Sequence, residues 1–252
     1  MPSSTTVQHN GEKIIFTEAT HEYVDSKSRK YTSVTTLVGM GFEKFDTIGI
    51  AKAKAAREGT NYKDLVNLWA ETGKKAANSG TRLHENCENQ ILGRVEMMHD
   101  PVTPEEALKF KFARDEVSRL LKDPENVKFE PEKLIFSPKY LLAGSVDLLV
   151  TRADGSYVIY DWKNVKEIKE TAFRDKKGIL DSTKDIQDSN YWHYALQLQL
   201  YEIILKVNSY IPKDAKVTRV INAFEVSGFH RYEMPNLLKE ACGLIKWNNI
   251  QK

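Results

Sequence analysis

Residues 144–164 read GSVDLLVTRADGSYVIYDWKN, and this stretch decides the fold. Two runs rich in valine, leucine, isoleucine and tyrosine flank the turn-forming pair Asp154-Gly155, as expected of a β-hairpin. The same runs carry Asp147, Asp161 and Lys163, although a buried charge is costly without a partner. The segment therefore predicts a largely buried hairpin whose charged residues need either one another or a bound cation.

The length of the hairpin loop decides which of these charges meet. A two-residue turn at 154–155 would set Asp147 opposite Trp162 and send the two aspartates to opposite faces of the sheet. A three-residue loop at 153–155, with its glycine in the left-handed region, sets Asp147 opposite Asp161 instead. Only the second register brings two carboxylates side by side.

Lys163 follows Asp161 by two residues, so both side chains point to the same face of the strand. Adjacent carboxylates repel each other unless a cation lies between them, so the second register predicts a site for a hard divalent metal ion. The alternative is an Asp161–Lys163 ion pair on a solvated face. The flanking residues Val146, Leu148 and Ile159 favour coverage of both faces, and therefore the metal site.

The composition narrows the class of protein. Of 252 residues, 41% are hydrophobic and 29% charged, and the net charge of +2 means that nucleic-acid binding would need a local basic surface. No apolar run approaches the roughly 20 residues that span a bilayer, and the polar start has no signal-peptide core, so we expect an intracellular protein without a membrane partner. Cys87 and Cys242 are too few for a four-cysteine iron–sulfur cluster, and we expect both to be buried.

The order of the predicted elements indicates the fold class. The segments KIIFTE, HEYVD and YTSVTTLV predict short strands, and helical spacing follows over 46–91 and from Pro104 to about 123. Strands over about 127–164, a polar stretch to 190, a helix over 191–205, a strand over 216–226 and a helix over 234–247 complete the chain. We expect an α/β fold with a mixed central β-sheet flanked by helices, in which residues 1–76 elaborate a core of residues 77–252.

Three groups of residues resemble a known family. The Gly144–Asp147 segment followed by Asp161-Trp162-Lys163 resembles the GxxD and (D/E)xK signature of the PD-(D/E)xK nuclease superfamily, which implies a restriction-endonuclease-like core. Upstream, Gly80 and His84 resemble the GxxxH element of RecB-like nucleases. Downstream, Gln197 and Tyr201 match their QxxxY motif. The chain is therefore similar to the RecB-like exonuclease group, which includes phage exonucleases and the mitochondrial genome maintenance exonuclease.

The resemblance implies roles for these residues. His84, Asp147, Asp161 and the carbonyl of Trp162 would hold one or two Mg²⁺ or Mn²⁺ ions. Lys163 would act with the two aspartates in catalysis, and Gln197 and Tyr201 would position the lysine and the phosphate. Glu88 and Glu132 could support the metal, or they could be an ordinary solvated helix charge and an ordinary strand-end residue.

Contacts to DNA are expected from two segments. Ser33 and Thr35 resemble an SVT element of phage and mitochondrial members and could donate hydrogen bonds to phosphate oxygens; equally, alternating serine and threonine are ordinary in an edge strand. The segment after the hairpin and the helix that follows it supply cations and aromatic rings, with Phe173 as a further ring able to stack on a base. The alternatives are solvated charges and core packing. The residues expected in this second group are Lys166, Arg174, Lys176, Lys177, Tyr191 and Trp192.

The implied function is metal-dependent hydrolysis of DNA, foremost by an exonuclease acting on DNA ends or single strands in replication, recombination or repair. Replication or recombination proteins are the expected partners, and the cytoplasm of a phage-infected bacterium is the expected location. A structure-specific or double-strand endonuclease is the alternative within the enzymes. A non-catalytic DNA-end-binding protein is the alternative of another class.

Overall fold

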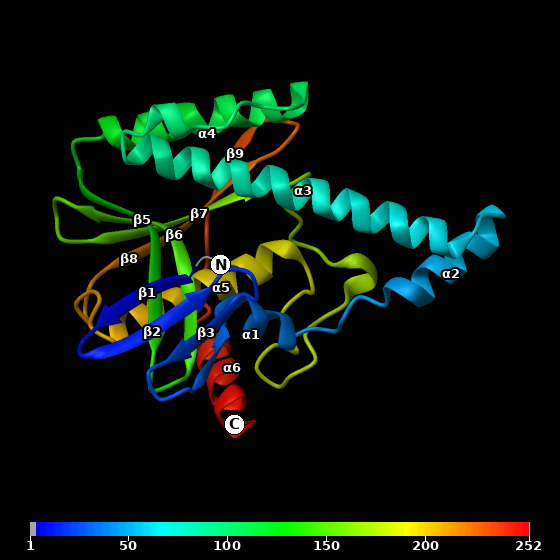
Figure 1. The fold of residues 1–252 in the computed structure, drawn as a ribbon. Helices are drawn as coiled ribbons and strands as arrows, with labels where there is room; N and C mark the ends of the chain where they lie inside the picture. The colour runs from blue at the N-terminus through cyan, green and yellow to red at the C-terminus, as the bar shows by residue number, and fades with distance from the viewer. Residues whose placement is uncertain (1–3, 252) are drawn as a thin grey trace.

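A nine-stranded sheet runs through the computed structural model, which describes residues 4–251 (Figure 1). Its N-terminal part is an antiparallel meander that leads into a short fourth strand. The central part adds five strands. The strands are β1 (Ser4–His9), β2 (Glu12–Thr17), β3 (Glu22–Asp25), β4 (Lys30–Ser33), β5 (Asn126–Ser137), β6 (Leu142–Arg152), β7 (Tyr157–Asn164), β8 (Val217–Phe224) and β9 (Phe229–Glu233).

The sheet is mixed, because parallel and antiparallel pairs alternate across its centre. Strands β4 and β6 pair in parallel, and so do β7 and β8. Strands β5 and β6, β6 and β7, and β8 and β9 pair antiparallel. With helices on both faces, this arrangement confirms the predicted fold class.

The β6–β7 hairpin has the three-residue loop. Leu148 pairs with Tyr160 and Thr151 with Tyr157, and the Arg152 amide donates to the Ser156 carbonyl at 2.8 Å. Residues 153–155 therefore form the loop, and Gly155 adopts a φ of 80°, which a side chain would disfavour. The predicted loop is confirmed, and its register continues toward Asp147 opposite Asp161.

One edge of β6 is left open beside this hairpin. A strand has two edges, and β5 pairs along almost all of one of them. On the other edge, β4 pairs only with Leu142 and Ala143, whereas β7 pairs from Leu148 onward. Within the described chain, the backbone from Gly144 to Asp147 thus has no strand partner on that edge. The sheet splays at this point, and the candidate site lies there.

Two layers of helices cover the sheet (Figure 1). Helices α3 (Tyr62–Ile91) and α4 (Pro104–Lys122) pack on the face that carries Leu148, Tyr160 and Trp162. The opposite face, with Leu149 and Ile159, is covered by α1 (Val34–Met40), α5 (Asn190–Val207) and α6 (Leu238–Ile250). Short 3-10 turns, η1 (Val95–Met97) and η2 (Phe173–Asp175), lie in the connections.

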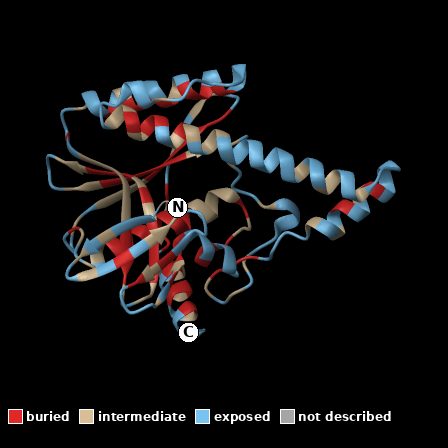
Figure 2. Cartoon of the chain, in the orientation of Figure 1, coloured by how far each residue is buried: buried red, intermediate tan, exposed pale blue. Residues whose placement is uncertain are grey.

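Helix α3 extends far beyond the sheet, and α2 (Thr47–Glu58) packs along its projecting N-terminal half (Figure 1). At 30 residues, α3 is about 45 Å long. Its buried residues, among them Leu83 and Cys87, lie in the C-terminal half, and the projecting half is largely exposed (Figure 2). The expected boundary between residues 76 and 77 falls inside this continuous helix. We call α2 and the projecting half of α3, residues 47–80, the arm.

Two expectations about individual segments were wrong. The YTSVTTLV segment is not one strand, because the Ser33 side chain accepts from the Thr36 amide at 3.0 Å and begins α1 as its N-cap. Cys242 is exposed, since it lies on the solvent side of α6, whereas Cys87 is buried as expected. Strands β1 and β9 were not anticipated. Within residues 4–251, no helix has the length and apolar character that crossing a membrane requires.

Candidate metal and catalytic site

Three acids from three neighbouring strands lie in one row where the sheet splays. Strand β5 pairs Pro131 with Leu148 and Lys133 with Val146, which sets Glu132 opposite Asp147. The β6–β7 register sets Asp161 on the other side of Asp147. Glu132 itself has a φ of 45°, a conformation that non-glycine residues adopt rarely. The strands thus bring three carboxylates from a stretch of 30 residues, 132–161, into one place.

His84 reaches this row from α3. Its Nε2 lies 2.8 Å from the carbonyl oxygen of Trp162, so Nε2 carries the proton and donates it. The other ring nitrogen, Nδ1, then has a free lone pair, and it lies 3.5 Å from Asp147 Oδ2 and 3.9 Å from Glu132 Oε1. Asp147 Oδ2 also accepts from the Trp162 amide at 2.8 Å. The backbone of Trp162 lies where β7 no longer pairs with β6, and its amide and carbonyl thus orient the side chains of Asp147 and His84.

His84, Glu132 and Asp147 form a set of candidate metal ligands. One nitrogen or oxygen from each lies within 4.8 Å of the others. Burial and the neighbouring Asp147 carboxylate raise the pKa of Glu132 to about 8, so at neutral pH the free set holds a proton where a bound cation would replace it. One imidazole and two carboxylates suit Mg²⁺ or, better, Mn²⁺.

This set differs from the expected one. Glu132, expected only to support the metal, is a member of the set, and Asp161, expected as a ligand, is not. The Trp162 carbonyl accepts a hydrogen bond from His84 and has one lone pair left. Glu88 lies one helical turn after His84, and its charge contributes to the raised pKa of Glu132, so it lies near the set without being one of its members.

Asp161 and Lys163 form a buried ion pair beside the ligand set. Lys163 Nζ lies 2.6 Å from Asp161 Oδ2, and the Asp161 side chain is 1% exposed. Burial raises the pKa of Asp161 to about 6, although Lys163 opposes the shift. Burial disfavours the charge on Lys163, yet attraction to Asp161 and Asp147 outweighs it and raises the pKa of the amine. The ion pair that the sequence allowed exists, but it lies inside the protein and not on a solvated face.

Gln197 and Tyr201 reach the same pair from α5. Gln197 Nε2 donates to Asp161 Oδ1 at 3.0 Å and lies 3.1 Å from the Tyr201 hydroxyl. The structure therefore joins Gln197 directly to Asp161, and Tyr201 to Asp161 through Gln197. Tyr201 also packs on Gly144, where a Cβ would lie 2.7 Å from Tyr201 Cε1. The glycine of the GxxD motif thus leaves room for the tyrosine.

Two further side chains position Lys163, and sequence reasoning missed both roles. The Lys163 amine lies 4.8 Å from the centre of the Tyr194 ring, within reach of a cation–π interaction. The buried Lys109 of α4 donates to Asn164 Oδ1 at 3.1 Å and to the Val165 carbonyl at 3.2 Å, which fixes the chain just after Lys163. The sequence offered one indication for each role. Tyr194 is three residues before Gln197 and so shares its helix face, and Lys109 is a charged residue on the buried side of an amphipathic helix.

The residues expected to contact DNA are scattered. Ser33 is buried and caps α1, so its hydroxyl is occupied, whereas Thr35 is exposed. Trp192 donates to the Glu170 carbonyl at 3.0 Å, and Tyr191 packs edge-on against it. Lys166 and Lys177 are exposed in the segment after β7.

Arg174 and Lys176 line a pocket of about 900 Å³ between the η2 loop and the arm, and Lys166 lines another of about 720 Å³ between α3 and α4. Only the first of these two pockets is bordered by exposed aromatic rings, those of Phe45 and Phe173.

Comparison with known proteins gives distant structural likenesses. No protein-family model and no curated protein matches the chain. A crystal structure of a protein provisionally assigned as an exonuclease, from Eubacterium rectale, is similar with a TM-score of 0.43 and 14% identity. The alignment covers 69% of this chain and 65% of that one. The structure of the protein SSO0001 is similar with a TM-score of 0.31 and 13% identity, over 69% of this chain and 71% of that one.

Proposed function

We propose that this chain is a metal-dependent deoxyribonuclease that hydrolyses phosphodiester bonds of DNA. The observation that carries the proposal is the meeting of His84, Glu132 and Asp147 within 4.8 Å at the point where β6 and β7 part. A buried lysine–carboxylate pair lies directly beside them. Metal ligands next to a fixed cation are what a site needs to hold a phosphodiester and stabilise the charge that develops on it.

The metal would be Mg²⁺ or Mn²⁺, held by His84 Nδ1 and by oxygens of Glu132 and Asp147. When bound, such an ion acidifies a water molecule and polarises the phosphate. Asp161 lies next in the row and can complete the set once Lys163 turns to a phosphate. The donors fit this ion because both carboxylates lie on rigid strands and the imidazole is fixed through its other nitrogen.

Lys163 acts as a cation in this proposal. Because its pKa is raised, the amine stays protonated at neutral pH and does not take a proton from water. It donates hydrogen bonds to a non-bridging phosphate oxygen or to the attacking water, and it offsets the charge of the pentacovalent transition state. Asp161, Gln197 and Tyr194 hold the amine in place.

Exonuclease action on DNA ends is the finer form of the proposal, and the motif resemblance supports it. An endonuclease would use the same site, since the loops that admit the substrate decide between the two. DNA is the proposed partner, and replication, recombination or repair the proposed process. A DNA-end-binding protein without activity is the competitor from another class.

The test compares linear and closed circular single-stranded DNA in Mn²⁺ and in EDTA, with wild type, Lys163→Met and the matched surface variant Lys166→Met. Assays at pH 6, 7 and 8 with Mn²⁺ in excess cover both the deprotonation of Glu132, which metal binding requires, and the lower pH at which the buried variant is most stable. We expect metal-dependent degradation of the linear strand that Lys163→Met abolishes and Lys166→Met retains. Cutting of the circle would make the enzyme an endonuclease. Binding of DNA without cleavage under any of these conditions would refute the nuclease proposal.

A further inference from the structure

The largest of the described pockets lies between the arm and the loop around η2, about one helical turn from the candidate site. It has a volume of about 900 Å³. His193 of α5 lines it, whereas Tyr194 and Gln197 on the same helix contact Lys163 and Asp161. Four residues of helix correspond to about 6 Å along its axis. A DNA strand whose phosphate lies at Lys163 would therefore reach this pocket within a few nucleotides.

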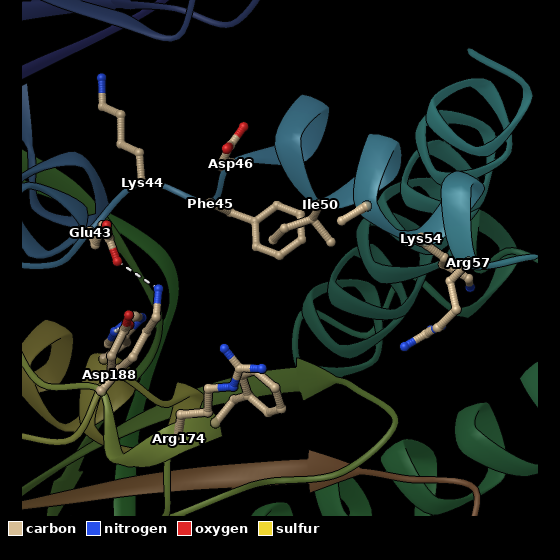
Figure 3. Close-up of a pocket in the computed structure, with 13 residues that line it drawn as sticks. Glu43, Lys44, Phe45, Asp46, Ile50, Lys54, Arg57, Arg174 and Asp188 are labelled. Carbon is tan, nitrogen blue, oxygen red and sulfur yellow. Dashed lines mark hydrogen bonds and ion pairs between the residues drawn. The ribbon is translucent and has the colours of Figure 1, made fainter. Parts of the chain in front are cut away.

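The pocket exposes aromatic rings that the core does not use. Phe45, just before α2, is 69% exposed, and Phe173 at the start of η2 is 76% exposed. Ile50, which lies beside Phe45 in Figure 3, adds a further exposed apolar side chain. Large apolar side chains that remain in water on facing sides of one pocket indicate a binding surface.

The charge of the pocket is positive once its internal pairs are counted. Five basic and three acidic side chains line it. All three acids are engaged: Glu43 pairs with Lys176 at 2.6 Å, Asp188 pairs with His193 at 3.0 Å, and Asp46 accepts from the Gly49 amide at the start of α2. Of the remaining cations, Lys54 and Arg57 lie 4.0 Å and 3.5 Å from the Glu58 carboxylate, in exposed pairs that stabilise little and can open to an anionic ligand. Arg174 makes no ion pair with the described residues.

Two arginines are placed to use this charge. In Figure 3, Arg57 of α2 and Arg174 of the η2 loop point toward one another across the pocket, and Phe45 reaches into the same space; Lys44 points away. The Arg174 guanidinium lies 5.1 Å from the centre of the Phe173 ring, and within residues 4–251 it makes no ion pair. A cation beside an exposed ring can hold a phosphate while the ring stacks on a base.

The loop that presents Phe173 and Arg174 is held in an unusual conformation. Arg174 and Asp175 both have positive φ, 56° and 53°, a region that is costly for side chains of this kind. Gln187 holds the loop, because it donates to the Asp175 carboxylate and accepts from the Ala172 amide at 2.9 Å. The strain is thus maintained by the fold, and its effect is to present the ring and the guanidinium at the pocket.

We infer that this pocket binds unpaired nucleotides of a single DNA strand, with bases on Phe45 and Phe173 and backbone phosphates on Arg57 and Arg174. This inference rests on the proposed function, which places the scissile phosphate of the bound strand at Lys163. It adds the class of substrate, which is single-stranded DNA or a single-stranded overhang. A paired base keeps its faces stacked within the duplex, so two separate stacking rings select against intact double strands.

The experiment measures DNA binding without cleavage, in EDTA, by fluorescence anisotropy of a labelled 12-nucleotide poly-dT strand and of a blunt duplex of the same length. The variants are the double variant Phe45→Ala/Phe173→Ala, Arg174→Gln, and two matched controls on exposed residues elsewhere, Val127→Ala and Lys213→Gln. The two rings are exposed, so their removal leaves the core intact.

One stacked base is worth about 5- to 150-fold in affinity, so we expect the double variant, which loses two, to bind the single strand at least about 25-fold more weakly. Duplex affinity should stay within about 3-fold, and the controls should match wild type. Arg174→Gln should weaken single-strand binding and flatten its salt dependence. Unchanged single-strand affinity in the double variant, or an equal loss for duplex, would overturn the inference. Full competition by free dTMP at concentrations near the affinity for the strand would overturn it too, in favour of a small-molecule pocket.

These outcomes separate the pocket from the catalytic proposal. Cleavage in Mn²⁺ by a protein whose strand binding ignores Phe45 and Phe173 would leave the nuclease standing and remove the pocket. Ring-dependent strand binding by a protein that cleaves nothing would leave the pocket standing and remove the nuclease.

Discussion

Replacing Lys163 with methionine should destabilise the metal-free protein by an amount that grows with pH. In the wild type, the buried Asp161 carboxyl has its pKa raised to about 6 even with the lysine amine 2.6 Å away. Without the amine, the strongest opposition to the raised pKa of Asp161 is lost, and the carboxyl should stay protonated to about pH 8. Methionine keeps most of the volume of the lysine stem, so packing changes little.

The magnitude follows from the interval over which the two proteins differ. A carboxyl whose pKa is raised by folding stabilises the protein below its unfolded value, and this contribution is lost as pH rises through the folded value. In the wild type this stability contribution of Asp161 is lost by about pH 6, whereas in the variant its loss continues to about pH 8. Each pH unit between 6 and 8 then costs the variant about 1.4 kcal/mol relative to wild type. The loss of stability caused by the substitution should therefore be about 3 kcal/mol larger at pH 8 than at pH 6.

Urea unfolding in EDTA at pH 6, 7 and 8 measures this difference directly. The double variant Asp161→Asn/Lys163→Met is the matched control, because it has no carboxyl to titrate and should lose stability equally at all three values. The reasoning would be refuted if the single variant were destabilised by the same amount at pH 6 and pH 8. That result would mean that lysine packing, and not its charge, supports Asp161.

Three further predictions test the geometry. Mn²⁺ binding, measured by calorimetry in two buffers of different ionisation enthalpy, should release protons at pH 7 and weaken as pH falls, because the pKa of Glu132 is about 8 in the free site. Glu132→Gln should weaken Mn²⁺ binding and remove most of the proton release. An unchanged proton release in this variant would mean that another group loses the proton. Gly144→Ala should lower stability to thermal unfolding by about 1–3 kcal/mol, since its Cβ would lie 2.7 Å from Tyr201 Cε1. Gly80→Ala should be neutral or stabilising, because a Cβ there meets nothing within 4 Å. Equal effects of the two substitutions would contradict the packing of Tyr201 on Gly144. Ser33→Ala should lower the free energy of unfolding by about 0.5–2 kcal/mol because it removes the N-cap of α1, whereas Ser33→Asp should retain most of the stability. If Ser33→Ala lost DNA binding without losing stability, Ser33 would be a phosphate contact instead.

The hairpin and its charges could be predicted from sequence because local rules determine them. The Ala-Asp-Gly loop sets the register, and alternation along β7 puts Asp161 and Lys163 on one side. The place of Glu132 could not be predicted in the same way. It depends on the pairing of β5 with β6 and on a left-handed residue within β5, which alternation does not reveal.

The errors have a similar cause. Alternating serine, valine and threonine at 33–36 favour a strand, but the Thr36 amide donates to the Ser33 hydroxyl, and this N-cap begins a helix. The pocket beside the arm joins Phe45 and Phe173, which are more than a hundred residues apart and show no pattern that links them. Tertiary packing alone brings them together.

The pairing of β4 with β6 has a consequence for synthesis of the chain. Ser33 pairs with Ala143, so the two partners leave the ribosome 110 residues apart. At translation rates of about 5–20 residues per second, the N-terminal meander waits about 5–20 s before its docking strand exists. During that interval the edge of β4 is an unpaired template for other chains. The nascent protein should therefore be most prone to aggregation, and to capture by chaperones, between the emergence of β4 and that of β6.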